Sequence, residues 1–327
     1  MIPSTARVVI VTPVYEDFEA SSRLFKELKS ELGDEVFIVA VDDGSVKQPL
    51  DTTGLDLAEA QGVVLKLRRN VGHQKAIAIG VGYVATHLHD GQSVVVMDSD
   101  GEDLPSSIPT LMQPLASEQV DVVVAHRKSR VETLRFKAFY AIYKRLFRVI
   151  TGRSISFGNF MAMKSSGVKR LSAMPELSIH VASAVLASKL RLATCPLDRG
   201  PRYAGQSKMN FVGLALHGFK GMMVFAEDVL VRVGIASAIV AVLSVISGST
   251  AVFLKAIGYS TPGWASVVLG IMVLMFMQTG VLALMTLMLT GVVRSGTVTS
   301  ELGYQDFIDE ILVSAATDAP VAAAAVS

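Results

Sequence analysis

The chain places an apolar run directly before two carboxylates in Ser93-Val94-Val95-Val96-Met97-Asp98-Ser99-Asp100. The apolar half of this stretch has the continuous hydrophobicity of a strand buried inside a parallel sheet. Its acidic half then lies at the carboxyl end of that strand, where open α/β sheets bind ligands. Adjacent carboxylates repel each other unless a proton or cation lies between them, and Mg²⁺ binds through a few carboxylates together with substrate phosphates. The simpler alternative is a polar turn built on Asp100-Gly101.

Strand-like and helix-like segments alternate along the first part of the chain. The strand-like runs are residues 7–12, 36–41, 62–67, 93–97 and 120–125, and the helix-like runs are residues 18–32, 73–88 and 105–116. This alternation predicts an α/β fold with a mainly parallel sheet and helices on both faces. No G-x-G-x-x-G follows the first strand and no G-x-x-x-x-G-K-[ST] occurs, which argues against a dinucleotide-binding fold and a P-loop NTPase.

Two long uncharged runs, residues 233–254 and 265–293, lie in the C-terminal part of the chain. Each exceeds the roughly 20 residues that a helix needs to span a bilayer, so they predict two transmembrane helices joined as a hairpin. Lys and Arg are concentrated in the N-terminal part, whereas the link between the runs holds only Lys255. The positive-inside rule therefore predicts a multi-pass membrane protein with two spans, whose N-terminal domain and tail lie on the cytoplasmic face.

The expected organisation is a domain over residues 1–210, a juxtamembrane interface helix over 211–231, the two spans within 232–294, and a partly disordered tail over 295–327. Residues 133–151 place Phe and Tyr at helical spacing among Lys and Arg, which is typical of an amphipathic helix in the membrane interface; a soluble helix packed on the sheet is the alternative. The net charge of +1 gives no case for nucleic acid binding, and a single cysteine excludes an intramolecular disulfide.

Several motifs, in order along the chain, resemble those of the family 2 glycosyltransferases of GT-A fold. Within that family the resemblance is to the polyprenyl-phosphate glycosyltransferases, such as dolichol-phosphate mannose synthases and bactoprenol glucosyltransferases. It covers about residues 7 to 295, including the hairpin. The motifs are Thr12-Pro13-Val14-Tyr15-Glu16, Val41-Asp42-Asp43-Gly44-Ser45, Arg69-Asn70-Val71-Gly72-His73-Gln74-Lys75, Met97-Asp98-Ser99-Asp100-Gly101-Glu102-Asp103-Leu104-Pro105, Ala125-His126-Arg127, Gly158-Asn159-Phe160, and Arg202-Tyr203-Ala204-Gly205-Gln206-Ser207-Lys208-Met209.

The resemblance implies an inverting, metal-dependent transfer of a sugar from a nucleotide sugar, with a UDP-sugar expected before a GDP-sugar, to polyprenyl phosphate at the bilayer. The residues implied to line the nucleotide-sugar pocket are Pro13, Tyr15, Glu16, Asp42, Asp43, Asn70, Gly72, Lys75, Asp98 and Ser99. The implied ligands of Mg²⁺ or Mn²⁺ are Asp98, Asp100 and Glu102, and Glu102 stands where related enzymes usually have Gln. The implied catalytic residues are Asp98, Asp100 and Arg127.

The resemblance also implies a set of basic residues that hold the lipid phosphate, because guanidinium groups make bidentate contacts with phosphate. These residues are Arg127, Arg135, Arg145, Arg202 and Lys208. The ordinary alternative for them is solvated surface charge.

One position departs from the family pattern. Relatives commonly have Gly-Asp-Phe where this chain has Gly158-Asn159-Phe160, and an asparagine cannot act as a base. A phosphomonoester has its second pKa near ~6 and is largely a dianion at neutral pH, so it can attack an anomeric carbon without a base. The departure therefore favours a lipid-phosphate acceptor over a hydroxyl acceptor.

Other functions are compatible with parts of the sequence. A processive or other hydroxyl-acceptor membrane glycosyltransferase is the nearest alternative, but the single Trp264 lies in the link between the spans and not in the Gln-x-x-Arg-Trp motif of processive enzymes. A non-catalytic membrane-anchored relative is favoured by Asn159 and disfavoured by Asp98, Asp100 and Arg127. A transporter would need charged or broken segments within its spans, and neither run has a charge. A homo-oligomer packed through the spans is compatible with the sequence.

Overall fold

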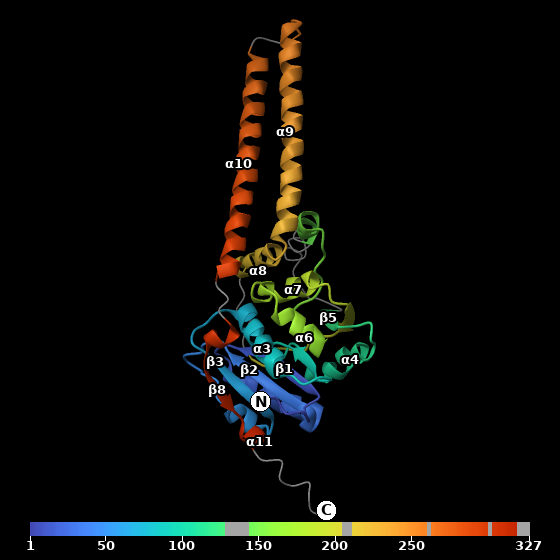
Figure 1. The fold of residues 1–327 in the computed structure, drawn as a ribbon, viewed down its shortest axis with the longest axis vertical. Coiled ribbons are helices and arrows are strands. Elements are labelled where there is room, and N and C mark those ends of the chain that lie inside the picture. The colour runs from blue at the N-terminus through green and yellow to red at the C-terminus, as the bar shows by residue number, and fades with distance from the viewer. Residues whose placement is uncertain (128–143, 205–210, 260–262, 300–302, 319–327) are drawn as a thin grey trace, which may run out of the picture. The chain divides into compact units, whose positions relative to one another are not determined.

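The computed structural model describes residues 1–127, 144–204, 211–259, 263–299 and 303–318. It divides into two compact units (Figure 1). The first unit comprises Met1–Lys137, Ile155–Val224 and Leu302–Ser327, and the second comprises Ala138–Ser154 and Phe225–Glu301.

The first unit is built on a mixed sheet with strand order β7-β5-β6-β4-β1-β2-β3-β8. The strands are β1 (Val8–Val14), β2 (Val36–Asp42), β3 (Gln61–Leu67), β4 (Ser93–Val96), β5 (Val122–Arg127), β6 (Met161–Lys164), β7 (Leu192–Leu197) and β8 (Ile308–Val313). The pairs β4–β1, β1–β2, β2–β3 and β5–β7 are parallel, whereas β6 and β8 run antiparallel to their neighbours. The predicted α/β fold with a mainly parallel sheet is therefore confirmed.

Helices cover both faces of this sheet, because both faces of its central strands are apolar. The helices of the first unit are α1 (Phe18–Leu32), α2 (Thr53–Leu57), α3 (His73–His87), α4 (Ile108–Met112), α6 (Ser165–Ser172), α7 (Val181–Ala187), α8 (Phe211–Met223) and α11 (Ala315–Asp318). Alternate residues of a strand point to opposite faces. Val9 and Val11 accordingly pack in the cluster that contains Ile77 of α3, whereas Ile10 packs in the cluster that contains Phe25 of α1.

The prediction of one continuous helix over residues 105–116 is wrong. The chain forms a 3-10 turn at Pro105–Ser107, the short helix α4, and a second 3-10 turn at Gln113–Ala116. Pro109 is near the start of α4 and Pro114 is near the start of the second turn. Proline lacks an N–H group and clashes with the preceding turn, so it restricts helices to short pieces here.

The tail beyond the apolar runs contains ordered elements that the sequence reading missed. Residues Tyr304–Phe307 form a 3-10 turn, β8 adds to the sheet beside β3, and α11 follows. Figure 1 shows β8, near the red end of the colour range, lying along β3. This strand was not predicted because the charged pair Asp309-Glu310 interrupts its apolar residues. An edge strand tolerates such charges, since one of its faces remains in water. The alanine-rich end, residues 319–327, lies outside the described residues.

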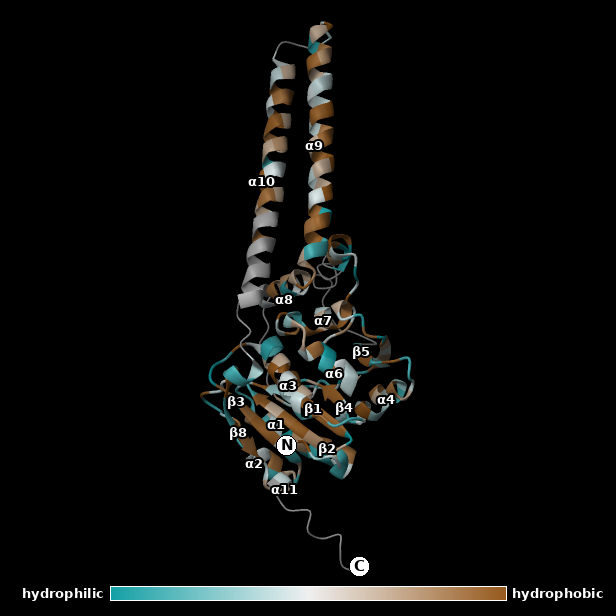
Figure 2. Cartoon of the chain, in the orientation of Figure 1, coloured by the Kyte–Doolittle hydropathy of each residue, from teal (hydrophilic) through white to brown (hydrophobic). Residues whose placement is uncertain are grey.

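The second unit contains two long antiparallel helices, α9 (Ala226–Ala256) and α10 (Trp264–Thr299). Both are long and apolar enough to cross a membrane, with mean hydropathies of 2.5 and 2.3 in their most apolar windows. Figure 2 shows the predominantly hydrophobic colouring of α9. Only 6% and 0% of those windows is buried, unlike the core helix of a soluble protein. Residues 144–151 form a further helix, whose buried Phe147 packs edge-on against Phe225 with ring centroids 6.0 Å apart. Residues 133–143 of the predicted interface helix lie outside the described residues.

Candidate functional site

An acidic turn follows β4 at the carboxyl edge of the sheet. Gly101 makes the turn possible, because its φ of +85° is a conformation that other residues rarely adopt. The backbone N–H of Glu102 donates to Asp100 Oδ1 at 3.0 Å, and the N–H of Asp98 donates to Asp103 Oδ2 at 3.2 Å. The turn thus keeps the Asp98 and Asp100 side chains together at the end of β4, where the sequence predicted them.

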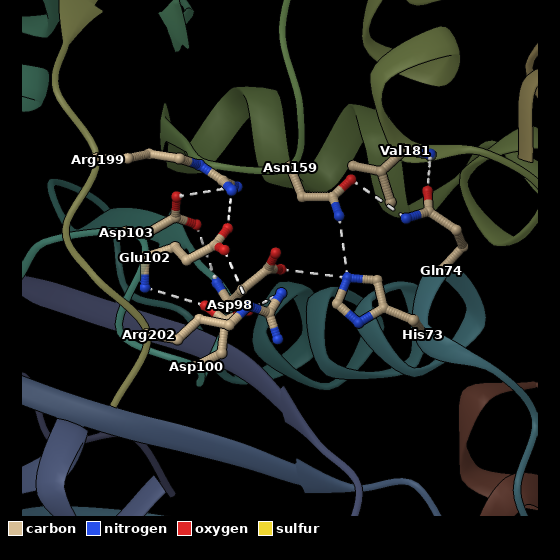
Figure 3. A network of polar contacts seen from close by, with 10 residues as sticks. All are labelled: His73, Gln74, Asp98, Asp100, Glu102, Asp103, Asn159, Val181, Arg199 and Arg202. Atoms are coloured by element: carbon tan, nitrogen blue, oxygen red, sulfur yellow. Dashed lines mark hydrogen bonds and ion pairs between the residues drawn. The ribbon is translucent and has the colours of Figure 1, made fainter. Parts of the chain in front are cut away.

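Two arginines from the segment after β7 lie against these carboxylates (Figure 3). Arg202 Nη2 is 2.7 Å from Asp100 Oδ2, and its Nε donates to Glu102 Oε1 at 2.9 Å. Arg199 pairs with Glu102, and its Nη2 is 3.8 Å from Asp103 Oδ1. Sequence reasoning identified Arg202 but missed Arg199, although both belong to the run Asp198-Arg199-Gly200-Pro201-Arg202.

The segment that carries these arginines is fastened to the rest of the first unit. The N–H of Tyr203 donates to the carbonyl oxygen of Asp100 at 2.9 Å, and the Tyr203 hydroxyl donates to Glu27. The guanidinium carbon of Arg23 lies 4.2 Å above the centre of the Tyr203 ring. A Cβ at Gly101 would lie only 2.6 Å from that ring, so the glycine also makes room for the tyrosine.

The donor chemistry of the acidic turn suits a divalent cation. Burial, and next the negative charge of Asp98, raises the pKa of Asp100, so this carboxylate gains from a nearby positive charge. Hard oxygen ligands are those that Mg²⁺ and Mn²⁺ prefer. Within the described part of the chain, no three His, Cys, Asp or Glu side chains already form a group that could hold a metal ion. Glu102 pairs with both arginines and Asp100 with Arg202 alone, so Asp98 and Asp100 are the more available of the three predicted ligands.

A chain of polar contacts leads from the acidic turn to α7. His73 Nε2 is 3.2 Å from Asp98 Oδ1 and 2.9 Å from Asn159 Nδ2. Gln74 Nε2 donates to Asn159 Oδ1 at 3.2 Å, and the N–H of Val181 donates to Gln74 Oε1 at 2.7 Å (Figure 3). Burial works to lower the pKa of His73, but the carboxylates of Asp98, Asp100 and Asp43 outweigh it and raise that pKa. Asn159 therefore lies within this site, beside the acidic turn.

The acidic residues after β1 and β2, which were predicted to line the nucleotide-sugar pocket, accept hydrogen bonds from backbone N–H groups of loops. Both oxygens of Asp43 accept backbone N–H groups, from Val71 at 2.7 Å and from Gly72 at 3.0 Å. Asp42 accepts the N–H groups of Ser45 and Leu50. The Glu16 carboxylate accepts the N–H groups of residues 46, 47 and 48, and these bonds lower its pKa. Each of these carboxylates shapes the carboxyl edge of the sheet, and direct contact with a nucleotide stays a prediction for all of them.

The remaining predicted pocket residues lie at the same edge with different exposures. Tyr15 is 45% exposed, Pro13 and Ser99 are buried, and Asn70 is exposed. Gly72 has a φ of +90° immediately before α3 begins at His73. The ammonium of Lys75 in the first turn of α3 lies 4.0 Å from the centre of the Phe307 ring.

The predicted lipid-phosphate residues are only partly described. Arg135 and Lys208 lie outside the described residues, and for Arg127 only the backbone, at the end of β5, is described. Arg145 is exposed on the helix formed by residues 144–151 of the second unit. Of this set, the structure places Arg202 beside the acidic turn.

Known proteins resemble the first part of the chain. Residues 9–167 match the model of the family Glycosyl transferase family 2. The uncharacterized glycosyltransferase YkoT of Bacillus subtilis is 27% identical over 81% of this chain and 81% of its own length. The uncharacterized glycosyltransferase sll0501 of Synechocystis is 27% identical over 83% of this chain and 86% of its own length. The comparisons therefore support a glycosyltransferase family 2 domain over residues 9–167.

Solved structures also resemble the chain. Glucosyl-3-phosphoglycerate synthase from Mycobacterium tuberculosis, crystallised with Mn²⁺, UDP and phosphoglyceric acid, is 16% identical with a TM-score of 0.47. The similarity covers 68% of this chain and 78% of that chain.

Proposed function

We propose that this protein is an inverting glycosyltransferase that moves a sugar from a nucleotide sugar, expected to be a UDP-sugar, to polyprenyl phosphate at the cytoplasmic face of a membrane. The observation that carries the proposal is the half-buried pair Asp98 and Asp100 at the carboxyl edge of the sheet, with Arg202 against it, in a family 2 domain. This arrangement supplies negative charge for a cation and positive charge for phosphate within one site.

The reaction would form a bond between the anomeric carbon and an oxygen of the lipid phosphate, and break the bond from that carbon to the diphosphate. Mg²⁺ or Mn²⁺ at Asp98 and Asp100 would supply positive charge to the departing diphosphate. Arg202 and Arg199 hold carboxylates in this structure, and an incoming phosphate oxygen is an equivalent partner for a guanidinium group. Asn159 removes no proton, which a largely dianionic phosphate acceptor does not require.

The two apolar helices support a membrane location. The chain before α9 and the strand β8 after α10 belong to the same sheet. If α9 and α10 both cross a bilayer, they therefore leave and return on one side, as a hairpin does. The excess of Lys and Arg in the N-terminal part, compared with Lys255 alone in the link, supports the cytoplasmic side for the domain.

The test is transfer by the full-length protein purified in detergent. Polyprenyl phosphate, Mn²⁺ and a panel of radiolabelled UDP- and GDP-sugars are supplied, and the lipid is then extracted. We expect label in a mild-acid-labile lipid from one donor, and a loss of at least about a hundredfold in Asp100→Ala, because a group that stabilises charge in the transition state is removed. Label in an oligosaccharide or a free alcohol acceptor instead would overturn the phosphate acceptor. Nucleotide binding without any transfer would favour a non-catalytic relative.

A further inference from the structure

The chain beyond α10 lies along β3 and α3 of the first unit. We call residues 303–318 the C-terminal strap. Its strand β8 pairs with β3 from Val63↔Val313 to Leu67↔Ile308. Its end is fixed as well, because the N–H of Gly62 donates to the Thr317 hydroxyl at 2.9 Å. The strap is thus an integral edge of the sheet.

The first residues of the strap contact the C-terminal part of α3. A Cβ at Gly82 would lie 3.1 Å from three atoms of the Tyr304 side chain, so α3 and Tyr304 are in close contact. The Tyr304 hydroxyl is 2.7 Å from the Thr86 hydroxyl, and its ring meets Tyr83 edge-on at 6.4 Å. Three residues further along the strap, Phe307 lies beside the first turn of α3.

Phe307 meets the loop between β3 and α3. Its carbonyl oxygen accepts the N–H of Arg68 at 3.0 Å, and its ring centre lies 4.0 Å from the Lys75 ammonium. An ammonium over an aromatic face is attracted by the negative face of the ring. Burial, and next the positive charge of Arg69, lowers the pKa of Lys75, which shows that the ammonium lies where added negative charge would be favourable.

The same loop is held from its other side by Asp43, through the N–H groups of Val71 and Gly72. The loop and the first turn of α3 carry Asn70, Gly72 and Lys75, the residues expected to border the diphosphate and ribose. Both of its supports, Asp43 after β2 and Phe307 in the strap, come from distant parts of the chain.

We propose that Phe307 is a positioning residue for the donor: its ring holds the Lys75 ammonium for the diphosphate of a nucleotide sugar. The nucleotide-sugar pocket is then complete only when the chain beyond the two apolar helices is paired with β3. This inference rests on the proposed function, since it requires that a nucleoside diphosphate binds at this edge of the sheet.

The test is calorimetric binding of UDP, and separately of GDP, to the full-length protein in detergent with Mn²⁺. We expect Phe307→Ala to raise the Kd about two- to fivefold, the range that corresponds to the strength of an exposed cation–π contact. Phe307→Leu keeps an apolar side chain without the aromatic face and is expected to show the same loss. Phe307→Tyr keeps the face and is expected to restore the wild-type Kd.

A double-mutant cycle with Lys75→Met separates positioning from general weakening of the strap. In the Lys75→Met background, Phe307→Ala is expected to change the Kd no further. Ile311→Ala, at a 45% exposed position on β8, is the matched control and is expected to leave the Kd unchanged. The melting temperature of each variant shows whether it is folded.

The outcomes distinguish this inference from the proposed function. If the wild type binds neither UDP nor GDP, the proposed function fails and the inference fails with it. If the wild type binds and both Phe307→Leu and Phe307→Ala bind equally well or better, the inference alone is overturned. An equal rise in Kd on Phe307→Ala in the Lys75 and Lys75→Met backgrounds would also overturn it, because Phe307 would then act without Lys75.

Discussion

At the scale of single residues, His73 Nε2 lies between Asn159 and Asp98, which favour different protonation states of the ring. The N–H of Val181 orients the Gln74 amide, whose nitrogen then faces Asn159 Oδ1. Asn159 must therefore present its own N–H group to His73 Nε2, which can accept it only when that nitrogen carries no proton. The same nitrogen lies 3.2 Å from the Asp98 carboxylate, which favours the protonated ring. His73 is thus balanced between two partners with opposite requirements.

We expect Asn159→Asp to remove this balance. A carboxylate beside His73 Nε2 favours the charged ring, so the pKa of His73, already raised by Asp98, should rise further. Below that pKa, the charged ring holds Asp98 as an ion pair, so Mn²⁺ should bind more weakly as the pH falls. Histidine NMR titration measures the first effect, and Mn²⁺ titration at several pH values measures the second.

Asn159→Ala is the control for this prediction, because it removes the amide without adding charge. A histidine pKa that is the same in Asn159→Asp and Asn159→Ala would show that residue 159 does not act on His73 through charge.

At the scale of elements, α7 and α8 meet through a pair of histidines, of which His180 is buried and His217 is partly buried. His180 caps the N-terminus of α7, its Nδ1 accepting the N–H of Ser183 at 3.1 Å. The proton of the neutral ring is therefore on Nε2, which lies 3.1 Å from His217 Nε2 of α8. A second bond joins the helices, from the Ser183 hydroxyl to the carbonyl oxygen of Gly221 at 3.0 Å. Protonation of either ring would place a charge in this contact.

The histidine pair predicts acid sensitivity of the fold. Burial, and next the neighbouring His217, lowers the pKa of His180 to about 3, so between that pH and the ordinary value of 6.5 the unfolded chain binds more protons. The contribution of His180 to the free energy of unfolding is therefore fully present above about pH 6.5. It is lost as the pH falls toward 3, by at most about 2 kcal/mol at pH 5. The melting temperature of the purified protein as a function of pH measures this loss. His180→Asn keeps a capping acceptor without the titration and should flatten the profile, whereas the exposed His126→Gln should leave it unchanged.

Elements differ in how far the sequence predicts them. Residues 18–32 are α1 as predicted, because an acidic N-terminal turn and apolar positions at helical spacing act locally. β8 could not be found in this way, since its apolar face is defined only by β3, far away along the chain. In the site, Asp98 and Asp100 follow a recognisable strand. By contrast, the hydrogen bonds of the Glu16 carboxylate could not be predicted, because they depend on which backbone N–H groups the fold brings to it.

At the scale of the whole molecule, the pairing of β8 with β3 constrains the membrane topology. Both ends of the α9–α10 hairpin connect to one sheet, so the link between the helices must lie across the bilayer from the domain if the helices span it. Tyr259, 84% exposed, is in that link, and Val46, 86% exposed, is in the domain. The one native cysteine, Cys195, is buried and gives a low background for labelling.

We expect a membrane-impermeant maleimide to label Tyr259→Cys in intact cells, because the link faces outward. It should label Val46→Cys only after the membrane is permeabilised, because the domain is cytoplasmic by the distribution of Lys and Arg. Labelling of Val46→Cys alone in intact cells would reverse the orientation and place the donor site outside, where nucleotide sugars are not made. If both variants are protected in intact cells and labelled after permeabilisation, the helices lie on the membrane without crossing it. The acceptor phosphate would then have to reach the site from the same leaflet, without any contribution from a spanning hairpin.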